Sequence, residues 1–466
     1  LLLSREIKLL KNMSNRKEYI CLYTEHSVKS MNNIIRDKKE VYPLTELANE
    51  IMKTDYDSNE ARDCKWNLCL AFKILGEISI ERLEISITRL IMENEAMRSK
   101  ISVKNGKYYI YDEEFQNCSI VIKQVKSINQ AISEAKKYGS IPIDVFNNIP
   151  IEVVLFQISH KENLLLLKAH HVITDATSLL LIVKKIIKYY IAPNVEEEPR
   201  HGSYYEFMKE EEEFAKTNKA VKEIAFWDQE FAEYKPIRFP IDYSKENGPS
   251  YNIARFSFDT KRLQNVARKY KTSVFNVVLT IFHLAFAKIN NVSDTALYYL
   301  FENRLDPKYR ETIGCITRAI ANRYTFKENE TIESIHKKMR NKISTGFINR
   351  EKSLRFDHFV SDFVISYQTL SSKRENMKLD ECTIEMQPIM LVRKFPWLFI
   401  MVTESEEKVS VFFSCDLRKF SEEYLENLKL ISLEAEEFVC RMPEKSFRDF
   451  IDNSESDFEN ENIILI

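Results

Sequence analysis

Residues 168–178 read KAHHVITDATS and hold two adjacent histidines, His170 and His171, with Asp175 four residues after the second. The whole chain of 466 residues has eight histidines, so a neighbouring pair is not expected by chance. The apolar run before the pair is typical of a buried strand, and the run after Asp175 is typical of a helix. Asp175 stands where that helix would begin, a favoured position for a capping residue. The stretch therefore predicts a strand, a polar turn and a helix.

Adjacent side chains on a strand point to opposite faces, so one histidine can face the core while the other faces a cleft. The positive end of the following helix would lie close to the cleft histidine. A histidine in such a place suits the removal of a proton from an incoming nucleophile, because its pKa lies near neutral pH. Asp175 would cap the helix or pair with an arginine that fixes the turn.

The histidine pair has three other possible roles. A histidine at a strand end is often a structural residue of the core or its rim, whose ring nitrogens have hydrogen-bond partners. A metal site would need ligands that converge, whereas adjacent strand histidines diverge and no other cluster has metal-ligand spacing, so we expect no metal. A serine hydrolase would need a GxSxG elbow, which the sequence lacks.

Composition excludes several classes of protein. Lysine and arginine number 68 against 70 aspartates and glutamates, and no basic stripe is interleaved with aromatic residues, so we expect no nucleic-acid partner. Only seven glycines occur, without GxGxxG or GxxxxGK[ST], so no motif supports nucleotide binding. The eight cysteines are scattered without CxxC, as in a reducing compartment. We expect a cytoplasmic protein with no signal peptide and no membrane span.

Strand and helix patterns alternate through the chain and predict an α+β fold in two halves. The expected divisions are an N-terminal extension 1–40, a first subdomain 41–195, a linker 196–215, a second subdomain 216–451 and an acidic tail 452–466. Strands are expected at 66–75, 107–113, 118–125, 150–159, 162–173, 254–259 and 295–304. Helices are expected at 42–56, 78–94, 128–140, 175–191, 260–273 and 274–289.

HHVITDATS resembles the HHxxxDG motif of the CoA-dependent acyltransferase superfamily, which includes chloramphenicol acetyltransferase and the condensation domains of nonribosomal peptide synthetases. Further stretches resemble condensation-domain motifs in the family's order, from residue 41 to about 450: VYPLTELANEIM (41–52), NEAMRSKI (94–101), YYEFMKEEEEF (204–214), TSVFNVVLTIFHLAFAKI (272–289) and ENRLDPKYRETIGCITRAIANR (302–323). The DFGWG motif of plant-type acyltransferases is absent, which counts against that branch.

The resemblance implies a fold of two chloramphenicol-acetyltransferase-like subdomains arranged in a V, with a tunnel along their interface. His171 matches the catalytic second histidine, and His170 matches the first, mainly structural one. Asp175 matches an aspartate that pairs with an arginine, for which Arg304 is the best match and Arg98 the second. Trp227 matches the tryptophan of the linker motif, where a packing role suffices.

The resemblance also implies the chemistry. An acyl or aminoacyl group would pass from a thioester, held by coenzyme A or by the phosphopantetheine of a carrier protein, to an amine or hydroxyl. No permanently bound cofactor is implied; the partners would be a carrier protein acting in trans and a small-molecule acceptor, and the protein would be a monomer. An amide at the start of the 176–190 helix, or the hydroxyl of Thr177 or Ser178, would stabilise the oxyanion.

The sequence departs from the family's motifs at three places. Ala176 replaces the glycine after the aspartate, and its methyl group would either narrow the path of the pantetheine arm or leave it unaffected. Glu93-Asn94-Glu95 stands for RHE in the second motif. Thr317-Arg318-Ala319 stands for VNT, which would place a charge near the tunnel. These departures motivate an alternative function, a catalytically impaired condensation-like module that recruits a partner protein.

Overall fold

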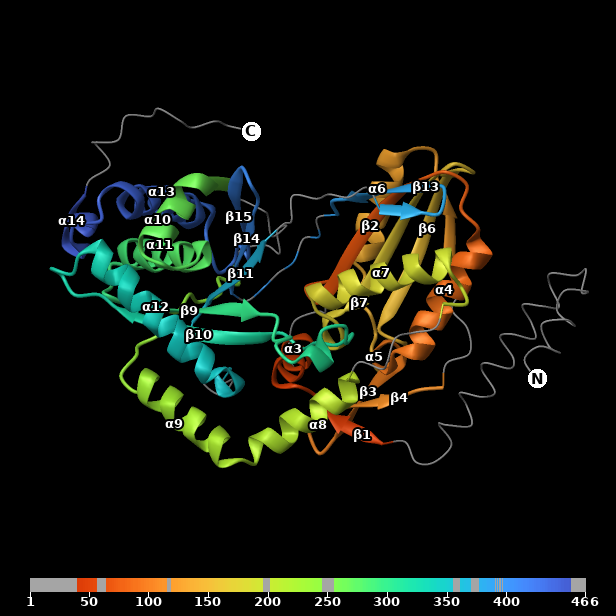
Figure 1. Ribbon diagram of the computed structural model, residues 1–466, viewed down its shortest axis with the longest axis horizontal. Coiled ribbons are helices and arrows are strands. Elements are labelled where there is room, and N and C mark those ends of the chain that lie inside the picture. Colours follow the sequence, from red (N-terminus) through yellow and green to blue (C-terminus); the bar gives the residue numbers. More distant parts are fainter. Residues whose placement is uncertain are drawn as a thin grey trace, which may run out of the picture.

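The computed structural model describes residues 40–56, 64–114, 119–195, 202–244, 255–354, 361–369, 377–389, 391, 393, 395 and 397–453. The predicted extension up to residue 39, the first part of the predicted linker (196–201) and the acidic tail from residue 454 lie outside the described residues. Two lobes, each built on a sheet with helices against it, make up the described chain (Figure 1).

The first lobe is built on a six-stranded sheet in the order β12-β13-β2-β7-β6-β5. Its strands are β2 (Asn67–Leu75), β5 (Val121–Gln124), β6 (Ile151–Ser159), β7 (Glu162–His170), β12 (Met377–Leu379) and β13 (Cys382–Gln387). Leu165 and Leu167 of β7 pack against helices α4 (Ile80–Glu93) and α7 (Ala176–Ile191) on one face. Leu164 and Leu166 pack with helix α6 (Ile128–Gly139) on the other. Both faces are covered, which explains the continuous apolar run before the histidines.

The second lobe is built on a six-stranded sheet in the order β10-β9-β11-β14-β15-β8. Its strands are β8 (Arg255–Asp259), β9 (Asp294–Phe301), β10 (Arg318–Thr325), β11 (Phe363–Thr369), β14 (Leu398–Glu404) and β15 (Lys408–Ser414). Its helices are α10 (Thr260–Lys269), α11 (Val274–Ile289), α12 (Ile332–Ile348), α13 (Glu422–Arg441) and α14 (Phe447–Asp452). Helix α11 is mainly apolar on all sides and is buried along nearly its whole length, as such a helix must be.

A smaller layer joins the lobes at their base. It holds the three-stranded sheet β1-β4-β3, in which the strands are β1 (Val41–Pro43), β3 (Ser99–Lys104) and β4 (Lys107–Asp112). Its helices are α3 (Glu46–Tyr56), α5 (Glu95–Arg98), α8 (Tyr204–Ala215) and α9 (Asn218–Phe231). Figure 1 shows α8 and α9 running along this base from the first lobe to the second.

The division of the chain into two sequential halves is wrong at one point. Strands β12 and β13 come from the region expected in the second subdomain, yet β13 pairs antiparallel with β2 of the first lobe, Thr383 opposite Leu75. Figure 1 shows both strands, in blue, on the sheet of the first lobe. The second half of the chain therefore completes the sheet of the first.

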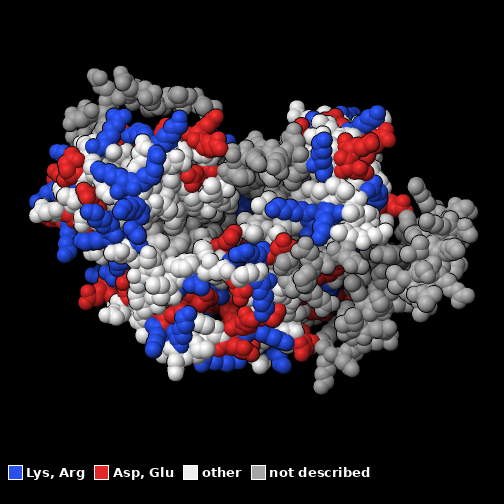
Figure 2. Space-filling view, in the orientation of Figure 1, with Lys and Arg blue, Asp and Glu red and all other residues white. Residues whose placement is uncertain are grey.

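The surface carries mixed charge. In the view of Figure 2, cationic and anionic side chains are interspersed over both lobes. Among the described residues, no single helix is long and apolar enough to cross a bilayer, although α10 and α11 together, bent by 100°, meet the length and composition of a span.

Candidate active site

The histidine pair lies at the point where β7 ends. His170 is the last residue of the strand, and His171 opens a single 3₁₀ turn, His171–Ile173. The His170 side chain is 1% exposed; its Nδ1 accepts a hydrogen bond from the Val172 amide at 3.2 Å, and its Nε2 lies 3.5 Å from Asp55 Oδ2. His170 therefore fixes the turn from within the core, whereas His171 is turned toward a cavity.

His171 is held by groups from both halves of the chain. Its amide donates to the Trp66 carbonyl at 2.8 Å, and its ring meets the Trp66 ring edge-on with the centroids 5.8 Å apart. Its Nδ1 lies 3.8 Å from the sulfur of Cys315, a buried residue that no motif in the sequence pointed to. Burial, with a smaller contribution from the nearby Arg393 guanidinium, lowers the pKa of His171 to about 4. The imidazole is thus neutral at pH 7 and able to accept a proton.

Asp175 lines the cavity, but both of its carboxylate oxygens accept hydrogen bonds that hold the turn. Its Oδ1 caps α7 by accepting from the Ser178 amide at 2.8 Å. Arg304 donates to both carboxylate oxygens at 2.9 Å, and the amides of Ile316 and Thr317 donate to Oδ2. Burial alone would raise the pKa of Asp175, but the Arg304 charge and these hydrogen bonds lower it overall. The carboxylate therefore stays ionised and ties α7 to the second lobe.

The second arginine considered from the sequence has a different partner. Arg98 pairs with Asp112, its Nε lying 2.7 Å from Oδ1, and it also donates to the Met92 carbonyl. Trp227 lies elsewhere too: it packs between Phe226 and Phe231 in the core of the second lobe, and its Nε1 donates to the Asn349 carbonyl at 2.7 Å. Neither Arg98 nor Trp227 lines the cavity.

The three residues at the start of α7 differ in what they offer the cavity. Ala176 and Thr177 line it, and the Thr177 hydroxyl donates to Glu302 at 2.9 Å. The expectation that the Ser178 hydroxyl could serve an oxyanion is wrong, because this buried hydroxyl donates to the Gly314 carbonyl and accepts from Arg304. The amides of Ala176 and Thr177 belong to the first turn of α7 and have no acceptor within the helix, so they remain the candidate donors.

The cavity lies between the lobes and has a volume of about 590 Å³. The first lobe and the base layer contribute His171, Ala176, Leu180, Leu47 and Ile51, and the second lobe contributes Tyr298, Leu300, Thr317, Ala319, Val364 and Met401. Next to His171 the wall is aromatic: Trp66 packs against Phe395 and Trp397, and Phe395 packs against Phe399. Arg393 lines the same wall and donates to the Asn67 carbonyl at 2.8 Å.

The Arg318 side chain, whose charge was expected near the tunnel, points away from the cavity. Thr317 and Ala319 line the cavity, but Arg318 between them faces the opposite side, as alternation along β10 requires. Its buried guanidinium pairs with Glu211 at 2.8 Å and with Glu351 at 2.9 Å. The departure at Arg318 therefore leaves the cavity wall uncharged at this position.

Glu93 and Glu95, which replace residues of the family's second motif, serve the fold. Glu93 accepts from Tyr189 and Arg89, and Glu95 accepts from the Tyr204 amide at the start of α8. Within the described residues, no group of three or more His, Cys, Asp or Glu side chains could hold a metal ion.

Comparison with known proteins gives a consistent picture. The family model described as "Condensation domain" matches residues 39–450. Tyrocidine synthase 2 of Brevibacillus parabrevis is 24% identical over 264 residues, which cover 55% of this chain and 7% of that protein. Surfactin synthase subunit 2 of Bacillus subtilis is 23% identical over 307 residues, 64% of this chain and 8% of that protein. The chain thus spans less than a tenth of the length of these curated relatives.

Solved structures share the fold at low sequence identity. The X-domain from teicoplanin biosynthesis superposes with a TM-score of 0.76 at 13% identity, covering 89% of this chain and 98% of that one. The first condensation domain of the calcium-dependent antibiotic synthetase, in complex with a substrate analogue, superposes with a TM-score of 0.68 at 13% identity, covering 88% and 99%. These likenesses extend over both lobes.

Proposed function

The chain belongs to the condensation-domain family, and from that premise we propose that it transfers an acyl or aminoacyl group from a thioester to an amine or hydroxyl, with His171 as its catalytic residue. The observation that carries the proposal is the position of His171 on the wall of a cavity that both lobes line. In this proposal the lobes form the two arms of a V, and the cavity is the middle of a tunnel between them.

The thioester would enter from one side of the tunnel and the acceptor from the other. Holding the two reactants together removes much of the entropic barrier to their reaction. The acceptor nitrogen or oxygen attacks the thioester carbonyl, and the intermediate then expels the sulfur as a thiolate. In this proposal Nδ1 of His171 carries the ring proton and faces the Cys315 sulfur, so that the unprotonated Nε2 takes the acceptor's proton and returns it to the thiolate. The Ala176 or Thr177 amide is the candidate donor to the oxyanion.

The donor would be a carrier-bound phosphopantetheine thioester, with acyl-CoA as the second possibility. Either one arrives as a co-substrate, and neither is a resident cofactor. The mainly apolar and aromatic lining favours an apolar acyl group, since such a surface gains most from burying one.

Recruitment of a partner protein is the second candidate function. Two observations favour it: Ala176 replaces the motif glycine at the cavity wall, and an X-domain in complex with OxyB from teicoplanin biosynthesis has the same fold, with a TM-score of 0.74. In that case the cavity would hold no reacting thioester, and binding would not depend on His171.

The test is to supply carrier-bound and CoA thioesters with a panel of amines and alcohols and to measure product and released thiol. We expect His171→Ala to lower the transfer rate by about 10²- to 10⁴-fold, the usual contribution of a general base, with the melting temperature unchanged. The matched control is His160→Ala, on the exposed turn between β6 and β7, which should keep full activity. Equal rates in the two variants would refute the catalytic role of His171. No transfer by the native chain, with retained binding of a carrier or synthetase partner, would favour recruitment.

A further inference from the structure

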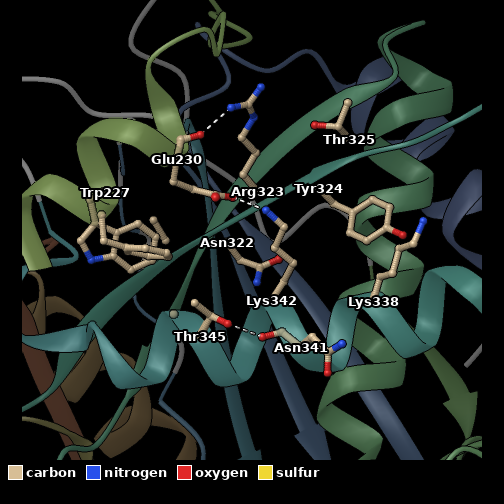
Figure 3. A pocket seen from close by; sticks show the side chains of 13 residues that line it. Trp227, Glu230, Asn322, Arg323, Tyr324, Thr325, Lys338, Asn341, Lys342 and Thr345 are labelled. Atoms are coloured by element: carbon tan, nitrogen blue, oxygen red, sulfur yellow. Dashed lines mark hydrogen bonds and ion pairs between the residues drawn. The ribbon is translucent and has the colours of Figure 1, made fainter.

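A groove in the second lobe lies apart from the cavity that holds His171 (Figure 3). Its volume is about 390 Å³, and it shares no lining residue with that cavity. The groove has two helical walls and a floor made by a strand. Helix α9 forms one wall with Phe226, Trp227 and Glu230, and residues 321–325 of β10 form the floor. Helix α12 forms the other wall with Lys338, Asn341, Lys342, Thr345 and Gly346. Trp227, which the transfer chemistry does not use, therefore belongs to this second feature.

The floor of the groove is the free edge of a sheet. Five successive residues of β10 line it, although side chains of a strand alternate between two faces, so the groove must follow the main chain. Among the described strands, β10 is the outermost of its sheet and pairs with β9 alone. The Ala321 amide donates away from β9, to the Ser353 hydroxyl at 2.7 Å. In an antiparallel pair of strands, the amides of successive residues point alternately toward the partner strand and away from it. Because the Ala321 amide points away from β9, the amides of Arg323 and Thr325 point away from it as well. No described group accepts from these two amides.

The two ends of the groove differ. At Gly346 it is closed, since a Cβ on this glycine would lie 3.4 Å from the Trp227 ring and 3.5 Å from the Ala321 carbonyl oxygen. At the other end Thr325 is exposed, and Figure 3 shows Tyr324 and Lys338 at this side, opposite Trp227. An extended chain could therefore enter along β10 from the Thr325 end.

The walls are richer in cations than in carboxylates. Arg323, Lys338 and Lys342 line the groove against one acid, Glu230, which pairs with Lys342. The partners of the other two cations, Asp294 for Arg323 and Glu330 for Lys338, lie outside the lining. The Lys338 and Lys342 side chains are 52% and 42% exposed, whereas their partners Glu330 and Glu230 are 4% and 19% exposed. The two ammonium groups therefore reach solvent, where a carboxylate entering the groove can contact them in addition to the buried partner.

We propose that this groove binds an extended acidic peptide segment of a partner protein, which adds to β10 as a further strand. The peptide main chain would pair with the Arg323 and Thr325 amides and carbonyls, and carboxylates on alternate residues would meet Lys338 and Lys342. This binding is independent of the transfer chemistry at His171.

The probe is a synthetic nine-residue peptide of alternating glutamate and threonine, with an alternating lysine and threonine peptide as control. Binding to the full chain is followed by fluorescence anisotropy, and exchange of amide hydrogens is measured over residues 319–326. We expect the acidic peptide, but not the lysine peptide, to bind saturably with a Kd below about 1 mM. Its binding should weaken at higher salt. Amide exchange over residues 319–326 should be slower when the acidic peptide is bound.

Thr325 supplies a matched pair of variants. Thr325→Pro and Thr325→Val both lose the hydroxyl bond to Asp294, but only the proline removes the amide on the open edge, where proline is tolerated. We expect Thr325→Pro to weaken the peptide by about tenfold and Thr325→Val to leave the affinity nearly unchanged. The double variant Lys338→Gln/Lys342→Gln should weaken it as well, and it carries the test if Thr325→Pro does not fold.

Three results would overturn the proposal. The first is the absence of saturable binding to the acidic peptide, and the second is equal affinities of the proline and valine variants for it. The third is a dimer, seen by light scattering, that Thr325→Pro dissociates and Thr325→Val does not. Such a dimer would assign the edge of β10 to a second copy of this chain in place of a peptide.

Discussion

At the scale of single residues, Asp175 is the most densely bonded group of the site. It accepts from Arg304, Ser178, Ile316 and Thr317, and its own side chain and that of Arg304 are 1% and 2% exposed. Replacing it with alanine would leave the Arg304 charge buried without its partner. We therefore expect Asp175→Ala to lower the free energy of unfolding by about 3–5 kcal/mol, measured by urea denaturation.

Asp259 offers the matched control for this prediction. It caps α10 by accepting from the Arg262 amide at 2.7 Å, but it is exposed, so Asp259→Ala should cost only about 1 kcal/mol. Adding Arg304→Met to Asp175→Ala should recover part of the loss, since it removes the unpaired charge. Equal losses in the two aspartate variants would mean that Asp175 acts as a helix cap and nothing more.

The sequence predicted some of these residues and not others, for a physical reason. His170, His171 and Asp175 are neighbours in the chain, so their spacing alone predicted a strand end, a turn and a cap. The match of Arg304 to the family's arginine pointed to the ion pair that the structure contains. Cys315, Arg393 and Trp397 carry no local signal, because they come from segments far from His171 in the chain. Arg393 and Trp397 line the cavity, and Cys315 contacts His171. The orientation of Arg318 was missed because the register of β10 depends on β9.

At the scale of elements, helices α11 and α12 bring two histidines into the core of the second lobe. His283 contacts Thr295 and Asn322 at 2.8 Å, and the His336 ring stacks on Tyr270. Burial lowers the pKa of His283 to about 3 and that of His336 to about 4, whereas an unfolded histidine has a pKa of about 6.5. Below pH 6.5 the unfolded chain therefore binds protons that the folded chain does not.

This difference in proton binding determines how the free energy of unfolding changes with pH. Stability is complete above about pH 6.5 and falls as the pH drops toward 4, and each such histidine adds a slope of about 1.4 kcal/mol per pH unit. We expect the free energy of unfolding, from urea titrations at pH 7, 6 and 5, to fall with acid. His336→Phe keeps the stacking on Tyr270 and removes one titrating group, so its slope should be shallower by about 1.4 kcal/mol per pH unit. An unchanged slope in that variant would contradict the argument.

Helices and strands with a regular spacing of apolar residues were predictable from the sequence. The pairing of the strands with one another was not. The run at 162–173 predicted a strand, and β7 spans Glu162–His170; the run at 274–289 predicted a helix, and α11 spans Val274–Ile289. The expected strand at 118–125 is shorter, since β5 covers only Val121–Gln124. Strands β12 and β13 are short. Their position beside β2 depends on pairing between residues about 300 positions apart in the chain, and the spacing of apolar residues along the sequence does not indicate such pairing.

At the scale of the whole molecule, the two lobes share structure at several points. β13 completes the sheet of the first lobe, Arg304 neutralises Asp175, and Arg318 pairs with Glu211 of α8. Each of these contacts satisfies a group of one half with a group of the other. The cavity wall beside His171 likewise combines Trp66 with Phe395 and Trp397. Neither half of the chain therefore contains a complete site or a complete set of partners for its buried polar groups.

Cutting the chain between Ala215 and Lys216 tests this interdependence. Expressed alone, residues 1–215 would present the edge of β2, nine residues long, without β13. They would also bury Asp175 without Arg304. An open edge of that length favours aggregation, so we expect this fragment to be insoluble or aggregated by size-exclusion chromatography. Co-expression with residues 216–466 should yield a soluble complex of both pieces that unfolds in one transition. A soluble monomeric 1–215 fragment with a cooperative unfolding transition would show instead that the first lobe folds by itself, and that β13 only extends a sheet already stable without it.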